Sequence, residues 1–226
     1  MYKGTGASPG SALGKALVLE HSEMNIERRT IENVEVNVYD YTPSDKKPNL
    51  YFSTLCYSNQ RTGVIRNFVL NLGTDIALYH ESAGLVNNNY GTIENGYIYG
   101  NDAIATPDPG GTSRKIALLQ KYGGSRSVVN KVFSLSNIIY KTNNEYDVTG
   151  ALTWETYGKV SNSFSTGTVN NVRLEKGPVV GEVKSTAETK NLYYMNETVY
   201  TNSYQQKVGP TVLNDANFYK TIFGDS

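Results

Sequence analysis

Cysteine and histidine are nearly absent from this sequence. Its 226 residues include one cysteine, Cys56, and two histidines. A single cysteine cannot form an internal disulfide, and we expect it to pack as a small apolar residue rather than to act as a nucleophile. Two histidines leave little scope for metal sites or for acid–base catalysis that depends on imidazole.

The chain also lacks an excess of charge of either sign and any long apolar run. It has 21 basic and 21 acidic side chains, so we expect no nucleic-acid partner. No stretch reaches the roughly 18 apolar residues of a membrane helix, so we expect no membrane insertion. The N-terminus lacks the apolar core of a secretory signal, and any export signal is expected to lie outside this chain.

Glycine and tyrosine, by contrast, are abundant. The sequence has 21 glycines and 18 tyrosines, while only 19% of its residues are charged. This composition favours many short strands and turns over helices.

One motif recurs along the chain, with good copies that begin at Gly63, Gly91 and Gly158. A turn glycine is followed by an apolar residue, an asparagine and another apolar residue at alternate positions. The asparagines that align are Asn67, Asn95, Asn130, Asn162 and Asn191. Alternation with period two predicts a strand with the asparagine on its inward face. Such repeats stack as coils, and the amides would then form a side-chain ladder.

A second strand is predicted upstream in each unit, at residues 83–86, 116–119, 150–152 and 178–181. Turn formers follow it at residues 87–91 and 121–124. The resulting prediction is an all-β fold, a parallel β-solenoid (β-helix) of about five coils.

The two ends of the chain are predicted to cover the stack. Residues 34–39 alternate and predict an N-terminal strand cap, and residues 42–49 predict a loop. Residues 213–224 predict a short helix, capped by Asp215 or Asn214 and ended by Gly224. Its apolar residues would face the last coil: Phe218, Ile222 and Phe223. We therefore divide the chain into a leader (1–33), a solenoid (34–212) and a C-terminal capping helix (213–226).

Residues 84–100, GLVNNNYGTIENGYIYG, closely resemble the GLUG repeat. Residues 150–167 are a second good copy, and residues 217–224 are similar to the segment that often closes such arrays. The resemblance covers roughly residues 50–224. It implies a parallel β-solenoid of bacterial surface proteins, which includes the non-catalytic region of IgA-protease-type zinc metallopeptidases of Gram-positive cocci. It is specific for fold and not for function, because the repeat occurs in adhesins and surface enzymes alike.

Residues 1–16, MYKGTGASPGSALGKA, are similar to the opening of enzyme I of the bacterial phosphoenolpyruvate-dependent sugar phosphotransferase system. Residues 21–35 would then begin its first long helix. Enzyme I works through a phosphorylated histidine in a GGxTSHxAI-type motif. The nearest match, residues 110–117, is one residue short and has Arg114 at the histidine position. Arginine cannot accept and pass on a phosphoryl group, so we interpret the opening as a borrowed or mis-joined leader.

Other candidate sites are incomplete. His80 and Glu81 begin an HExxH pattern, but Gly84 stands where the second zinc ligand is required. Asp102, Asp108 and Asp147 lack the spacing of a known calcium loop. We therefore expect no metal, no cofactor and no catalytic residues.

Tyrosines and carboxylates leave two alternatives open. Tyr99, Tyr194, Tyr200 and Tyr204 are candidates for an exposed aromatic strip suited to sugars or peptides. Paired carboxylates on one face of a β-helix would instead indicate a polysaccharide-degrading enzyme.

The sequence thus predicts a non-catalytic repeat module of a bacterial cell-surface protein, with a spacer, adhesion or substrate-presenting role. Its expected partners are a host protein or glycan and the neighbouring domains of a larger chain. Its expected location is extracellular or on the cell wall. The alternatives are a fragment or fusion of enzyme I and a β-helix polysaccharide-degrading enzyme.

Overall fold

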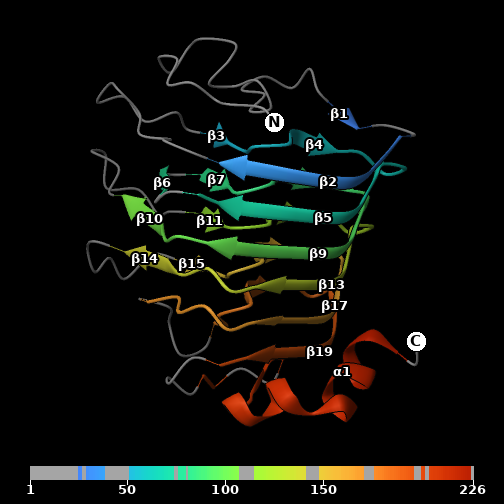
Figure 1. The fold of residues 1–226 in the computed structure, drawn as a ribbon. Coiled ribbons are helices and arrows are strands. Elements are labelled where there is room, and N and C mark those ends of the chain that lie inside the picture. The colour runs from blue at the N-terminus through green and yellow to red at the C-terminus, as the bar shows by residue number, and fades with distance from the viewer. Residues whose placement is uncertain are drawn as a thin grey trace.

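The computed structural model describes residues 25–26, 29–38, 51–73, 76–79, 81–106, 115–140, 148–170, 176–195, 200–201 and 204–224. These residues form a parallel β-solenoid with one short α-helix near the C-terminus (Figure 1). The predicted fold class is confirmed. The solenoid has about four turns, slightly fewer than the five coils expected.

In the described residues, three successive turns pass through four parallel sheets in the same order. The first is six-stranded and contains β1 (Asn25–Ile26), β4 (Cys56–Asn59), β8 (Val86–Asn89), β12 (Gln120–Gly123), β16 (Thr153–Thr156) and β18 (Val180–Val183). The second is seven-stranded and contains β2 (Thr30–Val38), β5 (Val64–Leu72), β9 (Thr92–Gly100), β13 (Val128–Ser134), β17 (Lys159–Ser165), β19 (Glu188–Tyr194) and β20 (Gln206–Lys207).

The return paths of these three turns use two smaller sheets. The three-stranded sheet contains β6 (Ile76–Tyr79), β10 (Ala103–Thr106) and β14 (Ile138–Tyr140). The four-stranded sheet contains β3 (Tyr51–Phe52), β7 (Glu81–Ala83), β11 (Lys115–Ala117) and β15 (Val148–Thr149). Because every pairing between turns is parallel and in register, equivalent residues lie in columns along the stack.

The core fills the centre of these coils with aliphatic side chains. Ile65 and Ile93 form one buried column, while Leu70 and Ile98 form another. Burying such columns is the main stabilising contribution that successive coils make to each other.

A kink in the seven-stranded sheet changes the direction of the repeat asparagines. Asn67 and Asn95 have φ angles of 51° and 52°, a left-handed conformation that asparagine tolerates better than most residues. The left-handed residue shifts the alternation of inward and outward side chains by one place. Ile65, Phe68 and Leu70 are therefore buried, and Asn67 is exposed. The predicted inward position of these asparagines is therefore wrong.

The predicted repeat unit differs from the structure in where its strands and turns lie, and two copies show this. Residues 87–89 and 121–123, expected as turns, belong to β8 and β12. Leu85 and Leu119, expected in strands, lie in bends just before them and are buried. Ala83, Ile116 and Ala117 do lie in β7 and β11, so these two predicted strands are correct at their first residues and turn into buried corners after them.

The N-terminal strand is longer than predicted. β2 begins at Thr30 and pairs along its length with β5, and β1 pairs with β4. Solenoid strands therefore begin before residue 34, and residues 30–35 are a strand instead of the long helix that the enzyme I resemblance implies. Its main motif, residues 1–16, and the predicted loop at 42–49 lie outside the described residues.

The C-terminal helix forms close to its predicted position. The 3₁₀ helix η1 spans Pro210–Asn214, and α1 spans Ala216–Phe223. The Asp215 carboxylate accepts a hydrogen bond from the Asn217 amide at 2.8 Å, so Asp215 is the N-cap, and Gly224 is the C-cap. In Figure 1 the helix lies at the C-terminal end of the stack.

Candidate functional site

The repeat asparagines form an outward column of amides. Asn67 Nδ2 donates to Asn33 Oδ1 at 3.3 Å, and Asn95 Nδ2 donates to Asn67 Oδ1 at 3.4 Å. Farther down the stack, Asn191 Nδ2 donates to Asn162 Oδ1 at 2.9 Å. The predicted ladder therefore exists at four of its five positions, but on the outer face, with Asn33 as an unpredicted first member.

Asn130, the fifth predicted member, lies one residue out of place. Lys131 takes the kinked position, with a φ of 55°, and Asn130 pairs in register with Glu94 and Ser161. The Asn130 side chain still reaches the column, because Asn162 Nδ2 donates to its Oδ1 at 2.9 Å. Lys131 interrupts the column below Asn95.

The inward amide ladder is built from other residues. Asn59 Nδ2 donates to Asn89 Oδ1 at 2.9 Å, and Asn89 Nδ2 donates to Gln120 Oε1 at 2.8 Å. Gln120 Nε2 then donates to Thr153 Oγ1 at 3.0 Å. All four side chains are fully buried. These hydrogen bonds between buried polar groups link four coils and favour one register.

The candidate metal and nucleophilic residues do not form a reaction centre in the described part of the chain. Burial raises the pKa of the Cys56 thiol to about 12, so the thiol stays protonated at neutral pH. Asp102 accepts a hydrogen bond from Asn137 Nδ2 at 2.9 Å. Among the described residues, no group of three or more His, Cys, Asp or Glu side chains is placed to hold a metal ion. His80, Asp108, Arg114 and Asp147 lie outside the described residues.

Two of the four predicted ligand-binding tyrosines belong to the core. Tyr194 is 2% exposed and Tyr200 is 7% exposed, and their rings pack edge to face at 5.3 Å. They are therefore unsuited to an exposed strip. Tyr204 is 49% exposed near the C-terminal end, and Tyr99 is partly exposed on β9. The structure does not bring these two into one strip.

An aromatic column does follow the outer face of the seven-stranded sheet. Tyr97, Phe133, Phe164 and Tyr193 occupy one register position on β9, β13, β17 and β19. Helix α1 covers its lower part. The Phe133 ring lies 4.9 Å from that of Phe223, and Phe218 packs against both Phe164 and Tyr193 at 6.1 and 5.0 Å. Tyr97 lies beyond the end of the helix and is 38% exposed.

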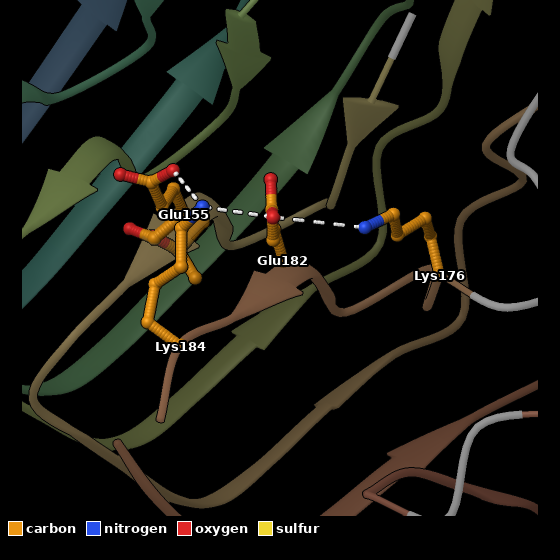
Figure 2. A network of polar contacts seen from close by, with 5 residues as sticks. Glu155, Lys176, Glu182 and Lys184 are labelled. Carbon is orange, nitrogen blue, oxygen red and sulfur yellow. Dashed lines mark hydrogen bonds and ion pairs between the residues drawn. The ribbon is translucent and has the colours of Figure 1, made fainter. Parts of the chain in front are cut away.

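A charged network lies on the six-stranded sheet (Figure 2). Lys184 Nζ lies 2.9 Å from Glu155 Oε2 and 2.8 Å from Glu182 Oε1, and Lys176 Nζ lies 3.7 Å from the same oxygen of Glu182. Burial disfavours the charge on Glu182, but hydrogen bonds and charge from Lys184 and Lys176 outweigh it and lower its pKa. Hydrogen bonds to Glu182 and Glu155 raise the pKa of Lys184. The network thus links two carboxylates and two ammonium groups through three contacts.

Tyrosines from three coils stand next to this network. Tyr122 lies between Tyr90 and Tyr157, with ring centroids 5.9 and 5.6 Å away. Burial, the two neighbouring tyrosines and Glu155 raise the pKa of Tyr122, so its hydroxyl stays protonated. Sequence reasoning missed this column because Tyr90 and Tyr157 directly follow their strands, whereas Tyr122 lies inside β12.

The network predicts a specific dependence of stability on acid. Because the folded pKa of Glu182 lies below its ordinary value of 4.5, its contribution is complete above that value and is lost as pH falls through the lowered pKa. In urea titrations from about pH 6 to about pH 3, Glu182→Gln should therefore lose stability less steeply than the wild type.

The control is Glu188→Gln, which removes a carboxylate from an exposed ion pair. The side chains of this pair, Glu188 and Lys159, are 68% and 58% exposed. This variant should keep the wild-type slope, since water screens that pair. Equal slopes for the wild type and Glu182→Gln would contradict the assignment.

No protein-family model matches the chain, and no curated protein matches it. Within the described residues, none of the helices has the length and apolar content needed to span a bilayer.

Proposed function

We propose that this chain is a non-catalytic repeat module of a bacterial cell-surface protein, with an adhesive or spacer role outside the cell. The GLUG-like copies at residues 84–100 and 150–167 motivate this proposal, and the solenoid fold is the one that they imply.

The repeated residues have structural roles in the solenoid, and this observation carries the proposal. The motif asparagines Asn67 and Asn95 supply the left-handed kink of their own coils, and Asn89 links buried amides between coils. Gly84 allows close approach of the next coil. The repeated features of the sequence thus serve register and packing, which suits a module whose role is architectural.

The charged network favours this role over glycan cleavage. A glycosidase needs one protonated carboxylic acid to donate to the leaving group, which requires a raised pKa. Glu182 has a lowered pKa, and Lys184 bridges it to Glu155. The lowered pKa of Glu182 is the opposite of what such an acid requires, and the Lys184 ammonium group occupies the space between the two carboxylates.

The test combines location with activity. Antibodies against the chain should label intact cells of its source, and the purified chain should leave immunoglobulin A, peptide libraries and polysaccharides uncleaved with or without added Zn²⁺. Zinc-dependent cleavage, release of reducing ends from a glycan, or labelling only after cell lysis would overturn the proposal.

A further inference from the structure

Exposed apolar side chains gather at one place on the seven-stranded sheet. Tyr97, Leu135 and Phe223 are 38%, 39% and 39% exposed. They are neighbours, because Tyr97 pairs with Phe133, whose ring packs on Phe223 at 4.9 Å. The amide of Leu135 donates to the Ile98 carbonyl at 2.8 Å, which places it beside β9. A clustered apolar patch on a monomer surface commonly marks a binding site.

Two tyrosines of β9 lie at the centre of this patch. Tyr97 and Tyr99 point to the same side of the strand, and their rings are nearly parallel, with an interplanar angle of 27° and centroids 5.5 Å apart. In the coil above, their register partners are Val69 and Asn71. The Asn71 amide donates to Asn37 Oδ1 at 2.8 Å. We call Tyr97, Tyr99, Asn71 and Asn95 the tyrosine platform.

Uncharged amides form the rim of the tyrosine platform. Asn67 on β5 and Asn95 on β9 are both exposed. Asn95 lies two residues before Tyr97 and four residues before Tyr99. Asn95 donates to Asn67, but no described residue donates to Asn95 Oδ1, because Lys131 replaces asparagine in the next coil. Each amide offers both donors and an acceptor, which matches hydroxyl groups.

The charges of this face argue against an anionic ligand. The outward positions of β2, β5, β9 and β13 carry three carboxylates, Glu32, Glu35 and Glu94, and two cations, Arg66 and Lys131. Arg66 pairs with Glu32 at 2.6 Å, and Lys131 Nζ donates to the Phe223 carbonyl at 2.7 Å. Three carboxylates against two cations give these strands a net negative charge, which disfavours a sulfate, phosphate or carboxylate ligand.

We propose that the tyrosine platform binds a neutral glycan. A sugar ring has a face of C–H groups, which the negative face of an aromatic ring attracts, and a rim of hydroxyls, which the amides of Asn71 and Asn95 can bind. A protein partner would be expected to cover a larger, more apolar area of roughly 800 Å². This inference rests on the proposed adhesive role and gives it a ligand class and a site.

The test uses a printed array of neutral oligosaccharides of glucose, mannose, galactose, xylose and N-acetylglucosamine beside sulfated and sialylated ones, followed by calorimetric titration with the best neutral binder. Tyr97→Ala should weaken binding by roughly tenfold or more, since it removes the stacking surface. Asn95→Gly keeps the backbone conformation, removes the amide and should weaken binding by roughly threefold. Tyr122→Ala, on the six-stranded sheet, is the matched control and should bind as the wild type does.

Four results would overturn the inference: no binding to any neutral glycan, binding to anionic glycans alone, unchanged affinity in both platform variants, or loss of affinity in Tyr122→Ala instead. Circular dichroism checks that each variant is folded. If Tyr97→Ala does not fold, the glycan affinity of the conservative variant Asn95→Gly tests the inference. A negative array together with positive labelling of intact cells would reject the glycan site and leave the proposed function standing.

Discussion

Gly84→Ala is expected to lower the free energy of unfolding by about 3 kcal/mol. A Cβ atom at this position would overlap the Leu118 carbonyl oxygen of the next coil. That oxygen belongs to the backbone and cannot rotate away. Hydrogen bonds also fix both coils, from Gly84 N to Ala117 O at 3.0 Å and from Leu118 N to Ala151 O at 3.0 Å. Relief would require separating two coils that share a ladder.

Urea denaturation followed by circular dichroism measures this effect. Gly209→Ala is the matched control, because its new Cβ would meet nothing nearer than Thr211 Oγ1 at 3.9 Å, and its φ of −89° suits any residue. It should change stability by less than about 0.5 kcal/mol. Equal stability of the two variants would show that the coils can move apart at Gly84.

Asn89→Ala is expected to cost about 3 to 5 kcal/mol, because it leaves buried polar groups without partners. Asn89 Oδ1 accepts from Asn59 Nδ2 at 2.9 Å and from the Gly91 amide at 3.1 Å, while its Nδ2 donates to Gln120 Oε1 at 2.8 Å. All these contacts are buried, so water cannot replace them without opening the coil.

Asn67→Gly tests whether burial is the cause. It also breaks side-chain hydrogen bonds between coils, to Asn33 and Asn95, but at an exposed position where water substitutes. Glycine keeps the left-handed backbone at no steric cost. Its loss of stability in the same urea titration should stay below about 1 kcal/mol. A loss as large as that of Asn89→Ala would mean that both columns contribute equally.

The fold was predictable because its signal is repetition. Apolar residues such as Ile65 and Ile93 recur next to turn glycines, and stacked coils are the structure in which such units bury one another. The helix ends were also predictable, since Asp215 and Gly224 have local capping chemistry that depends little on tertiary contacts.

The direction of the asparagines was not predictable from alternation alone. Period two holds only while every residue is extended, and the left-handed φ at Asn67 and Asn95 moves the following side chains to the other face. Asparagine is itself the residue that tolerates this conformation, so its recurrence was the available signal. It was assigned to an inward ladder, whereas Asn59, Asn89 and Gln120, at unequal places in their strands, form the buried one.

The candidate binding surface depended on side-chain neighbours that a linear pattern does not contain. The sequence predicts Tyr99 as a surface aromatic, but no linear pattern distinguishes its exposed neighbour Tyr97 from the covered aromatic residues of the same column. The exposure of Tyr97 follows from where α1 ends, at Phe223 above Phe133. Tyr194 and Tyr200 were misjudged because their burial depends on packing against each other.

Helix α1 also changes how the stack can come apart. In a simple array each coil touches only the one before and the one after, so segments can open singly. Here α1 packs on Phe133, Phe164 and Tyr193 at once, which belong to β13, β17 and β19. Phe218 alone contacts two of these strands. Strands β13, β17 and β19 are thereby joined into a single cooperative unit. Helix α1 must detach from this unit before any one of the three strands can unfold.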